Sequence, residues 1–310
     1  MGMLQDGRWT NETPVAPTDD KGRFQRADSG FRDRLSADGS SRYAAEADRY
    51  HLYVSLACPW AHRTLVVRAL KGLEELLPVT VVGPIMGECG WSFAERFGGS
   101  GDPVEGVEHL HQLYAIADSG MTGKVTVPVL WDKRERRIVN NESAEIIRML
   151  NTAFDDLGAK PGDYYPPELR DEIDPMNDRV YHSVNNGVYR AGFAQSQEAY
   201  DEAVHGLFDS LDWLETRLTG DWLVGGRLTE ADIRLFTTLV RFDPVYHGHF
   251  KCNIRRLVDY PRLRALTERI AALPGVAATI DLDQIKQHYY RSHPGINPSG
   301  IVPAGPAVPF

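Results

Sequence analysis

The segment Cys58-Pro59-Trp60-Ala61 places a thiol between a strand-like run and a helical run. Residues 50–56 carry apolar side chains with a period of two, as in a half-buried strand, and residues 61–70 carry an apolar stripe with helical spacing. Pro59 suits the first helical position, because the N–H that it lacks would have no partner there. Cys58 is therefore predicted at or beside a helix N-cap, where backbone donors and the helix dipole lower a thiol pKa and favour the thiolate.

A thiolate in this position predicts nucleophilic chemistry. The third residue after Cys58 is Ala61, so no resolving cysteine lies beside it and the pattern indicates a monothiol mechanism. The alternative is a small buried side chain, as most single cysteines are, but the turn from strand to proline-led helix favours catalysis. Cys89 and Cys252 are interpreted as structural, and we expect His62 on the surface of the helix.

Composition excludes several other classes of protein. The chain has 310 residues, a net charge of −9 and no extended basic stripe, which argues against nucleic-acid and membrane-surface partners. Three cysteines are too few for a disulfide framework, which fits a reducing compartment. We find no apolar run that could span a bilayer and no signal peptide, so we expect a soluble, cytoplasmic protein. The ten histidines show no metal-ligand spacing, so no metal site is predicted.

The periodicities divide the chain into an α/β part and an all-α part. Strands are expected at 50–56, 79–82, 127–131 and 137–139, and a helix at 143–150. The expected organisation is an extended arm at 1–45, an α/β domain at 46–160 with an insertion at 83–123, an all-helical domain at 166–290 and an extended proline-containing tail at 291–310. In the helical part, Thr229 and Asp232 form a predicted capping box, so Asp232 is interpreted as structural rather than catalytic.

Several segments extend this picture. They are Ser55–Arg63, Gly90–Phe93, Thr126–Asp132, Asn141–Ser143, Asn185–Tyr189, and the end from His288–Tyr290 through Ile301–Pro303. In this order they resemble the glutathionyl-hydroquinone reductases, the Xi class of the glutathione transferases, from about residue 30 to the C-terminus. The resemblance implies a thioredoxin-like domain, a helical C-terminal domain and a homodimer. It also implies reduction of a glutathionyl-hydroquinone by glutathione, which gives hydroquinone and glutathione disulfide.

The resemblance also implies which residues bind glutathione, the co-substrate; no permanently bound cofactor is expected. Val127-Pro128 resembles a cis-proline turn whose backbone pairs with the cysteinyl part of glutathione. Glu142 would meet the γ-glutamyl ammonium and Ser143 its carboxylate, although both also suit plain helix capping. Trp91 would pack against glutathione, or be a core tryptophan instead. Lys124 replaces the arginine frequent in this family and would offer a point charge to the glycyl carboxylate, or be a solvated surface lysine.

Tyr189 and Tyr290 fall in the segments that resemble the hydroquinone site of the family, where a phenol could supply or relay a proton. Tyr289 is adjacent, and the sequence does not separate it from Tyr290. The predicted function is a glutathionyl-hydroquinone reductase in which a Cys58 mixed disulfide is resolved by a second glutathione. The alternatives are a general monothiol transferase or dehydroascorbate reductase, a conjugating transferase, and a glutathione-binding protein without turnover.

Overall fold

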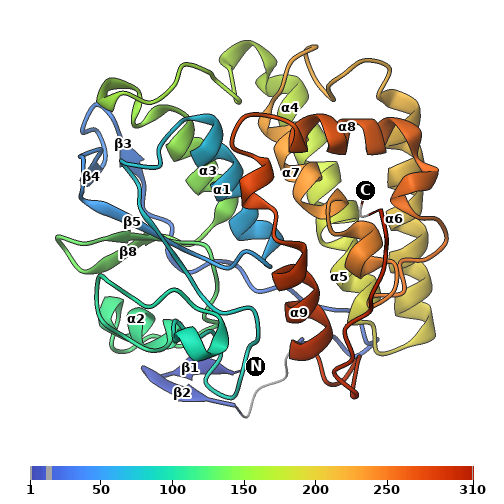
Figure 1. The fold of residues 1–310 in the computed structure, drawn as a ribbon, viewed down its shortest axis with the longest axis horizontal. Helices are drawn as coiled ribbons and strands as arrows, with labels where there is room; N and C mark the ends of the chain where they lie inside the picture. Colours follow the sequence, from blue (N-terminus) through green and yellow to red (C-terminus); the bar gives the residue numbers. More distant parts are fainter. Residues whose placement is uncertain (1, 12–15, 309) are drawn as a thin grey trace. The chain divides into compact units, whose positions relative to one another are not determined.

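The computed structural model describes residues 2–11, 16–308 and 310. The chain forms two compact units (Figure 1). Of the described residues, 2–11, 27–162 and 278–288 belong to the first unit, and 16–26, 163–277, 289–308 and 310 to the second. Positions 1 and 12–15 of the predicted arm and position 309 of the predicted tail lie outside the described residues.

A four-stranded sheet forms the centre of the first unit. Its strands are β5 (Tyr50–Val54), β6 (Val79–Val81), β7 (Val129–Asp132) and β8 (Arg137–Asn140), in the order β6-β5-β7-β8. β5 pairs with β6 in parallel, whereas the β5–β7 and β7–β8 pairs are antiparallel. The four predicted strands are thus confirmed, with ends that differ by one or two residues.

Three helices pack on this sheet. They are α1 (Pro59–Leu70), α2 (Leu110–Ala117) and α3 (Ser143–Thr152). α1 and α3 contact each other on one face, and α2 lies on the other (Figure 1). This is the thioredoxin-like arrangement that the resemblance implies. α1 is buried on nearly all its sides, because it also packs on the segment that follows residue 277: the imidazole Nε2 of His62 lies 2.8 Å from Thr279 Oγ1. The expectation that His62 lies on the surface is therefore wrong.

The N-terminal arm contributes to the core of the first unit, contrary to the expectation of a segment outside it. It forms two short strand pairs, antiparallel β1 (Met3–Gln5) with β2 (Arg8–Thr10), and parallel β3 (Leu35–Ser36) with β4 (Tyr43–Ala44). Its buried apolar side chains are Leu4, Leu35 and Tyr43. They stand singly in a polar segment, so they produce no periodic signal.

Helices make up the second unit. They are α4 (Arg170–Arg179), α5 (Gly187–Gly192), α6 (Gln197–Arg217), α7 (Glu230–Leu239), α8 (Pro261–Ala271) and the end of α9 (Leu282–Ser292), whose residues up to His288 belong to the first unit. The predicted capping box at the start of α7 is confirmed: the Thr229 N–H donates to Asp232 Oδ2 over 2.8 Å. Within the described part of the chain, no helix combines the length and apolar character needed to cross a bilayer.

Candidate active site

Cys58 is the N-cap of α1, as predicted, and Pro59 begins the helix. Its backbone is extended, with φ −76° and ψ 123°, and its carbonyl accepts the His62 N–H over 2.9 Å. The side chain is half-buried, and its Sγ lies 3.6 Å from the carbonyl oxygen of Val127. The sulfur therefore lies between a helix N-terminus and the backbone that leads into β7, and the residue is partly exposed.

The peptide bond between Val127 and Pro128 is cis, as predicted, and both residues are buried. A tyrosine of the insertion holds the residue before them: the Tyr114 hydroxyl donates to the Thr126 carbonyl over 2.8 Å and accepts from Asn141 Nδ2 at 3.0 Å. Complete burial raises the pKa of Tyr114, so its phenol stays protonated and can donate. Tyr114 thereby connects the proline turn to the start of α3. Sequence reasoning did not identify it, because nothing local distinguishes it from other tyrosines.

Glu142 and Ser143 begin α3. Glu142 is the N-cap, and its Oε1 accepts the Ala144 N–H over 3.0 Å, so the predicted capping role is confirmed. Ser143 is buried, and its Oγ accepts from Arg63 Nη1 at 3.3 Å. Arg63 is itself 1 % exposed and comes from α1, five residues after Cys58. A carboxylate, a hydroxyl, a helix N-terminus and a buried cation thus meet at one place, which suits a ligand with both an ammonium and a carboxylate.

The two other predicted glutathione residues lie elsewhere in the first unit. Trp91 is 6 % exposed, and its ring stacks on His288, with centroids 4.9 Å apart and planes at 21°. His288 is fixed in turn, because its Nδ1 lies 2.8 Å from the Pro84 carbonyl oxygen. Lys124 is half-buried rather than fully solvated, and desolvation lowers its pKa. Trp91 therefore has the packing of a core residue, and Lys124 lies three residues before Val127.

In the second unit, hydroxyl groups link three tyrosines. The Tyr189 and Tyr289 oxygens lie 2.5 Å apart, and those of Tyr289 and Tyr246 lie 3.0 Å apart. The Tyr290 hydroxyl instead donates to the Pro244 carbonyl over 3.4 Å. Burial raises the pKa of both Tyr246 and Tyr289, so these two phenols stay protonated. Of the two adjacent tyrosines, Tyr289 is thus the hydrogen-bond partner of Tyr189. Tyr246 has no sequence signal that points to it.

The two remaining cysteines differ from each other. Cys252 is fully buried, and burial raises the pKa of its thiol, which agrees with the structural interpretation. Cys89 is exposed, which does not fit a packing role, because it lies in the glycine-containing stretch between Gly87 and Gly90. Among the residues that the structure describes, no cluster of three histidine, cysteine or acidic side chains could hold a metal ion.

Comparison with known proteins agrees with this fold. The family model of the glutathione S-transferase N-terminal domain matches residues 57–153, and that of the C-terminal domain matches residues 197–269. Both halves of the chain are thus glutathione S-transferase domains.

Individual relatives define the family more narrowly. Glutathionyl-hydroquinone reductase PcpF of Sphingobium chlorophenolicum is 58% identical over 100% of this chain and 98% of its own length. Glutathionyl-hydroquinone reductase YqjG of Escherichia coli is 56% identical over 99% of this chain and 95% of its own. The structure of glutathione-bound YqjG superimposes with a TM-score of 0.91 at 54% identity, covering 98% of this chain and 96% of that one. The Xi class transferase of Natrialba magadii gives 0.94 at 47%, covering 99% and 94%. The chain belongs to the glutathionyl-hydroquinone reductases, the Xi class of the glutathione transferases.

Proposed function

We propose that this protein reduces glutathionyl-hydroquinones to hydroquinones with glutathione as the reductant. The Cys58 thiolate attacks the sulfur of the substrate, and the electron pair of the carbon–sulfur bond passes to the ring carbon, which takes up a proton. This step leaves a mixed disulfide between Cys58 and glutathione. A second glutathione thiolate attacks that disulfide, restores Cys58 and leaves as glutathione disulfide.

One observation carries this proposal: a half-buried sulfur at the N-cap of α1 that faces the Val127 carbonyl across 3.6 Å. Thiol–disulfide exchange needs an attacking thiolate, and a helix N-terminus stabilises one. Ala61 occupies the position, three residues after Cys58, where a resolving cysteine usually lies. The exchange partner therefore has to come from solution. Two relatives with more than half of their residues identical carry the name glutathionyl-hydroquinone reductase.

The glutathione contacts follow from the start of α3 and the proline turn. We assign the Val127 backbone to the cysteinyl part, the Glu142 carboxylate to the γ-glutamyl ammonium, and the Ser143 hydroxyl to the γ-glutamyl carboxylate. Arg63 supports the last assignment, because its buried guanidinium donates to Ser143 and adds positive charge there. Further glutathione contacts are assigned to Trp91, and to Lys124 at the glycyl carboxylate.

We assign the hydroquinone to the tyrosines. In the family that the sequence resembles, Tyr189 and Tyr290 fall in the hydroquinone segments, and a protonated phenol can supply the proton that the ring carbon requires. The hydrogen bond between Tyr189 and Tyr289 supports adding Tyr289 to this group. Replacement of each tyrosine by phenylalanine should lower turnover, and the variant with the largest fall identifies the proton donor.

Two measurements test the proposal. Enzyme incubated with a glutathionyl-hydroquinone and no glutathione should gain the mass of one glutathionyl group, located on Cys58 by peptide mapping. Turnover on the glutathionyl-hydroquinone should then exceed turnover on a small glutathione mixed disulfide and on dehydroascorbate. An unmodified Cys58 would contradict the mechanism, and faster turnover of the mixed disulfide would favour a general thiol transferase.

We further propose a cytoplasmic homodimer, for which light scattering should give twice the chain mass of 34.7 kDa.

A further inference from the structure

A short stretch of the N-terminal arm lies against the start of α3. The Ser29 hydroxyl is 3.1 Å from Glu142 Oε2 and 3.3 Å from the Asn141 carbonyl oxygen. The Phe31 N–H donates to Asn141 Oδ1 over 3.1 Å, and the Phe31 carbonyl accepts the Asn141 N–H over 3.1 Å. Arg32 forms an antiparallel bridge with Asn140 at the end of β8. The arm thus adds an extended segment beside the residues that begin α3.

Further contacts fix the residues that follow Ser29. Arg32 donates to both oxygens of Glu145, from Nε over 2.9 Å and from Nη2 over 2.6 Å. The ring of Phe31 packs edge-on against Tyr114, with centroids 5.7 Å apart. Tyr114 is the residue that also holds the proline turn. The position of Ser29 is therefore set by the same groups that order the proposed glutathione site.

The contact with Ser29 determines how the Glu142 carboxylate is oriented. Oε1 accepts the Ala144 N–H at 3.0 Å, and Oε2 accepts the Ser29 hydroxyl at 3.1 Å. Each carboxylate oxygen has two lone pairs, and Oε1 also lies 3.5 Å from the Ser143 hydroxyl, so Oε2 is the oxygen that keeps acceptor capacity for a cation. With Oε1 alone held, the carboxylate could rotate about its terminal torsion, which is broad for glutamate. The Ser29 hydrogen bond removes that freedom before a ligand arrives.

We propose that Ser29 is a positioning residue of the glutathione site, which orients the Glu142 carboxylate toward the γ-glutamyl ammonium. This inference rests on the proposed function, because it requires Glu142 to bind that ammonium. Its consequence is that the N-terminal arm, far from Glu142 in sequence, is part of substrate recognition. Ser29 itself makes no contact with the reacting sulfur in this scheme.

The test uses the full chain with Cys58→Ser, so that glutathione binds without forming a disulfide, and isothermal titration calorimetry. The ligands are glutathione and glutaryl-cysteinyl-glycine, which has hydrogen in place of the α-amino group. We expect Ser29→Ala to weaken glutathione binding about fivefold, since a hydrogen bond to a charged group is lost, and to leave the analogue within about twofold. Ser29→Thr, which keeps the hydroxyl, should restore discrimination between the two ligands.

Ser41→Ala is the matched control. Ser41 is another half-buried serine of the arm, but its hydroxyl donates to the Tyr43 carbonyl over 2.9 Å. The Ser41→Ala variant should bind both ligands with the same affinity as the parent. Equal glutathione affinity in Ser29→Ala and the parent would overturn the inference, and so would an equal loss for both ligands, which would indicate a general structural role. If the parent does not discriminate between the ligands, the ammonium assignment of Glu142 fails first. The comparison thus separates the two proposals.

Discussion

The two ends of β7 use polar groups in opposite ways. Before its first residue, the Val127 carbonyl faces the half-buried sulfur of Cys58, with 3.6 Å between them. At its last residue, the fully buried Asp132 has both carboxylate oxygens occupied by protein donors. Its Oδ2 accepts from Arg49 Nε at 2.9 Å and Nη2 at 2.5 Å, and its Oδ1 accepts the Arg134 N–H at 2.8 Å. One end of the strand keeps polar capacity for a ligand, and the other end uses it internally.

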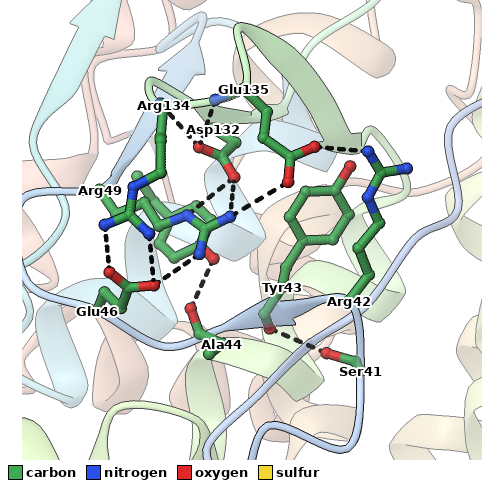
Figure 2. Close-up of polar contacts among 10 residues, drawn as sticks. Ser41, Arg42, Tyr43, Ala44, Glu46, Arg49, Asp132, Arg134 and Glu135 are labelled. Carbon is green, nitrogen blue, oxygen red and sulfur yellow. Dashed lines mark hydrogen bonds and ion pairs between the residues drawn. The ribbon is translucent and has the colours of Figure 1, made fainter.

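Figure 2 shows how far this internal pairing extends around Asp132. Arg49 Nη1 lies 2.7 Å from Glu46 Oε1, and Glu46 also pairs with Arg134. Glu135 pairs with Arg42 at 2.6 Å. The cluster therefore joins the arm to the turn between β7 and β8 through charges of both signs. A buried charge with a protein counter-ion thus supports the fold, whereas the Glu142 carboxylate, which is partly exposed and held by neutral donors, is suited to a cationic ligand.

The largest expected effect concerns Cys58, which faces the start of β7. Replacing Cys58 by serine should lower turnover about a thousandfold or more, because a hydroxyl at neutral pH is a far weaker nucleophile than a thiolate. The unfolding temperature should stay within about 2 °C of the parent, because the change removes no charge pair. The matched control is Cys89→Ser, since Cys89 is exposed, and it should retain full turnover. Substantial turnover in Cys58→Ser would contradict the proposed mechanism.

The next largest effect concerns Asp132, at the last residue of β7. Asp132→Asn removes the fully buried counter-ion of Arg49 and leaves it with Glu46 and Glu135, which are partly exposed. We therefore expect a loss of about 3 kcal/mol of unfolding free energy, the lower end of the cost of breaking a buried pair. Urea denaturation measures this loss. Under conditions where Asp132→Asn is folded, its turnover should equal that of the parent. Glu46→Gln removes a carboxylate that is 36% exposed, so its effect should be much smaller. Equal losses in the two variants would show that burial of the carboxylate does not determine how much it contributes to stability.

These contacts also show what the sequence could and could not reveal. Local signals predicted the strand before Cys58, its N-cap position and the capping box, since each depends on residues within one turn or strand. Ser29, Tyr114 and Arg49 had no such signal. Their partners lie far along the chain: Glu142 for Ser29, Asn141 for Tyr114 and Asp132 for Arg49. Propensity and periodicity report neighbours, so contacts made by tertiary packing are beyond them.

The arm and α1 show that composition and periodicity also fail to predict burial. The arm is polar and lacks a period, yet its isolated Leu4, Leu35 and Tyr43 are buried. α1 illustrates the converse case, because an apolar stripe predicts one buried face whereas His62 and Arg63, off that stripe, are buried as well. The number of neighbours that a helix has is a property of the whole fold. A single helix pattern cannot supply it.

A second fully buried carboxylate, Asp232, differs from Asp132 in its partners, and pH tests this difference. Asp232 in the second unit is as buried as Asp132, but its partners are neutral donors: the N–H groups of Leu223 and Thr229, and the Thr229 hydroxyl. Desolvation raises the pKa of Asp232 from 3.8 to about 6. Between these values the folded state holds a proton that the unfolded state has lost, so unfolding free energy falls as pH rises.

The measurement for Asp232 is urea denaturation of the parent and of Asp232→Asn at several pH values. The free-energy difference, parent minus variant, should fall by roughly 3 kcal/mol between pH 3.5 and pH 7, since each pKa unit corresponds to about 1.4 kcal/mol. A difference that stays constant across this range, or rises with pH, would show that folding does not raise the pKa of Asp232.

The smallest expected effect concerns Glu142 in the proposed glutathione site. Glu142→Gln keeps an oxygen that can accept the Ala144 N–H, so the start of α3 should persist, but it removes the negative charge that would face the γ-glutamyl ammonium. We expect KM for glutathione to rise about tenfold, since a charge-assisted hydrogen bond contributes about 1.5–3 kcal/mol, and kcat to change little. Steady-state kinetics at saturating glutathionyl-hydroquinone separate the two constants. Glu135→Gln is the control, because its carboxylate pairs with Arg42 and makes no contact with Ser29 or Glu142, and it should leave KM unchanged. An unchanged KM in Glu142→Gln would assign this carboxylate to helix capping alone.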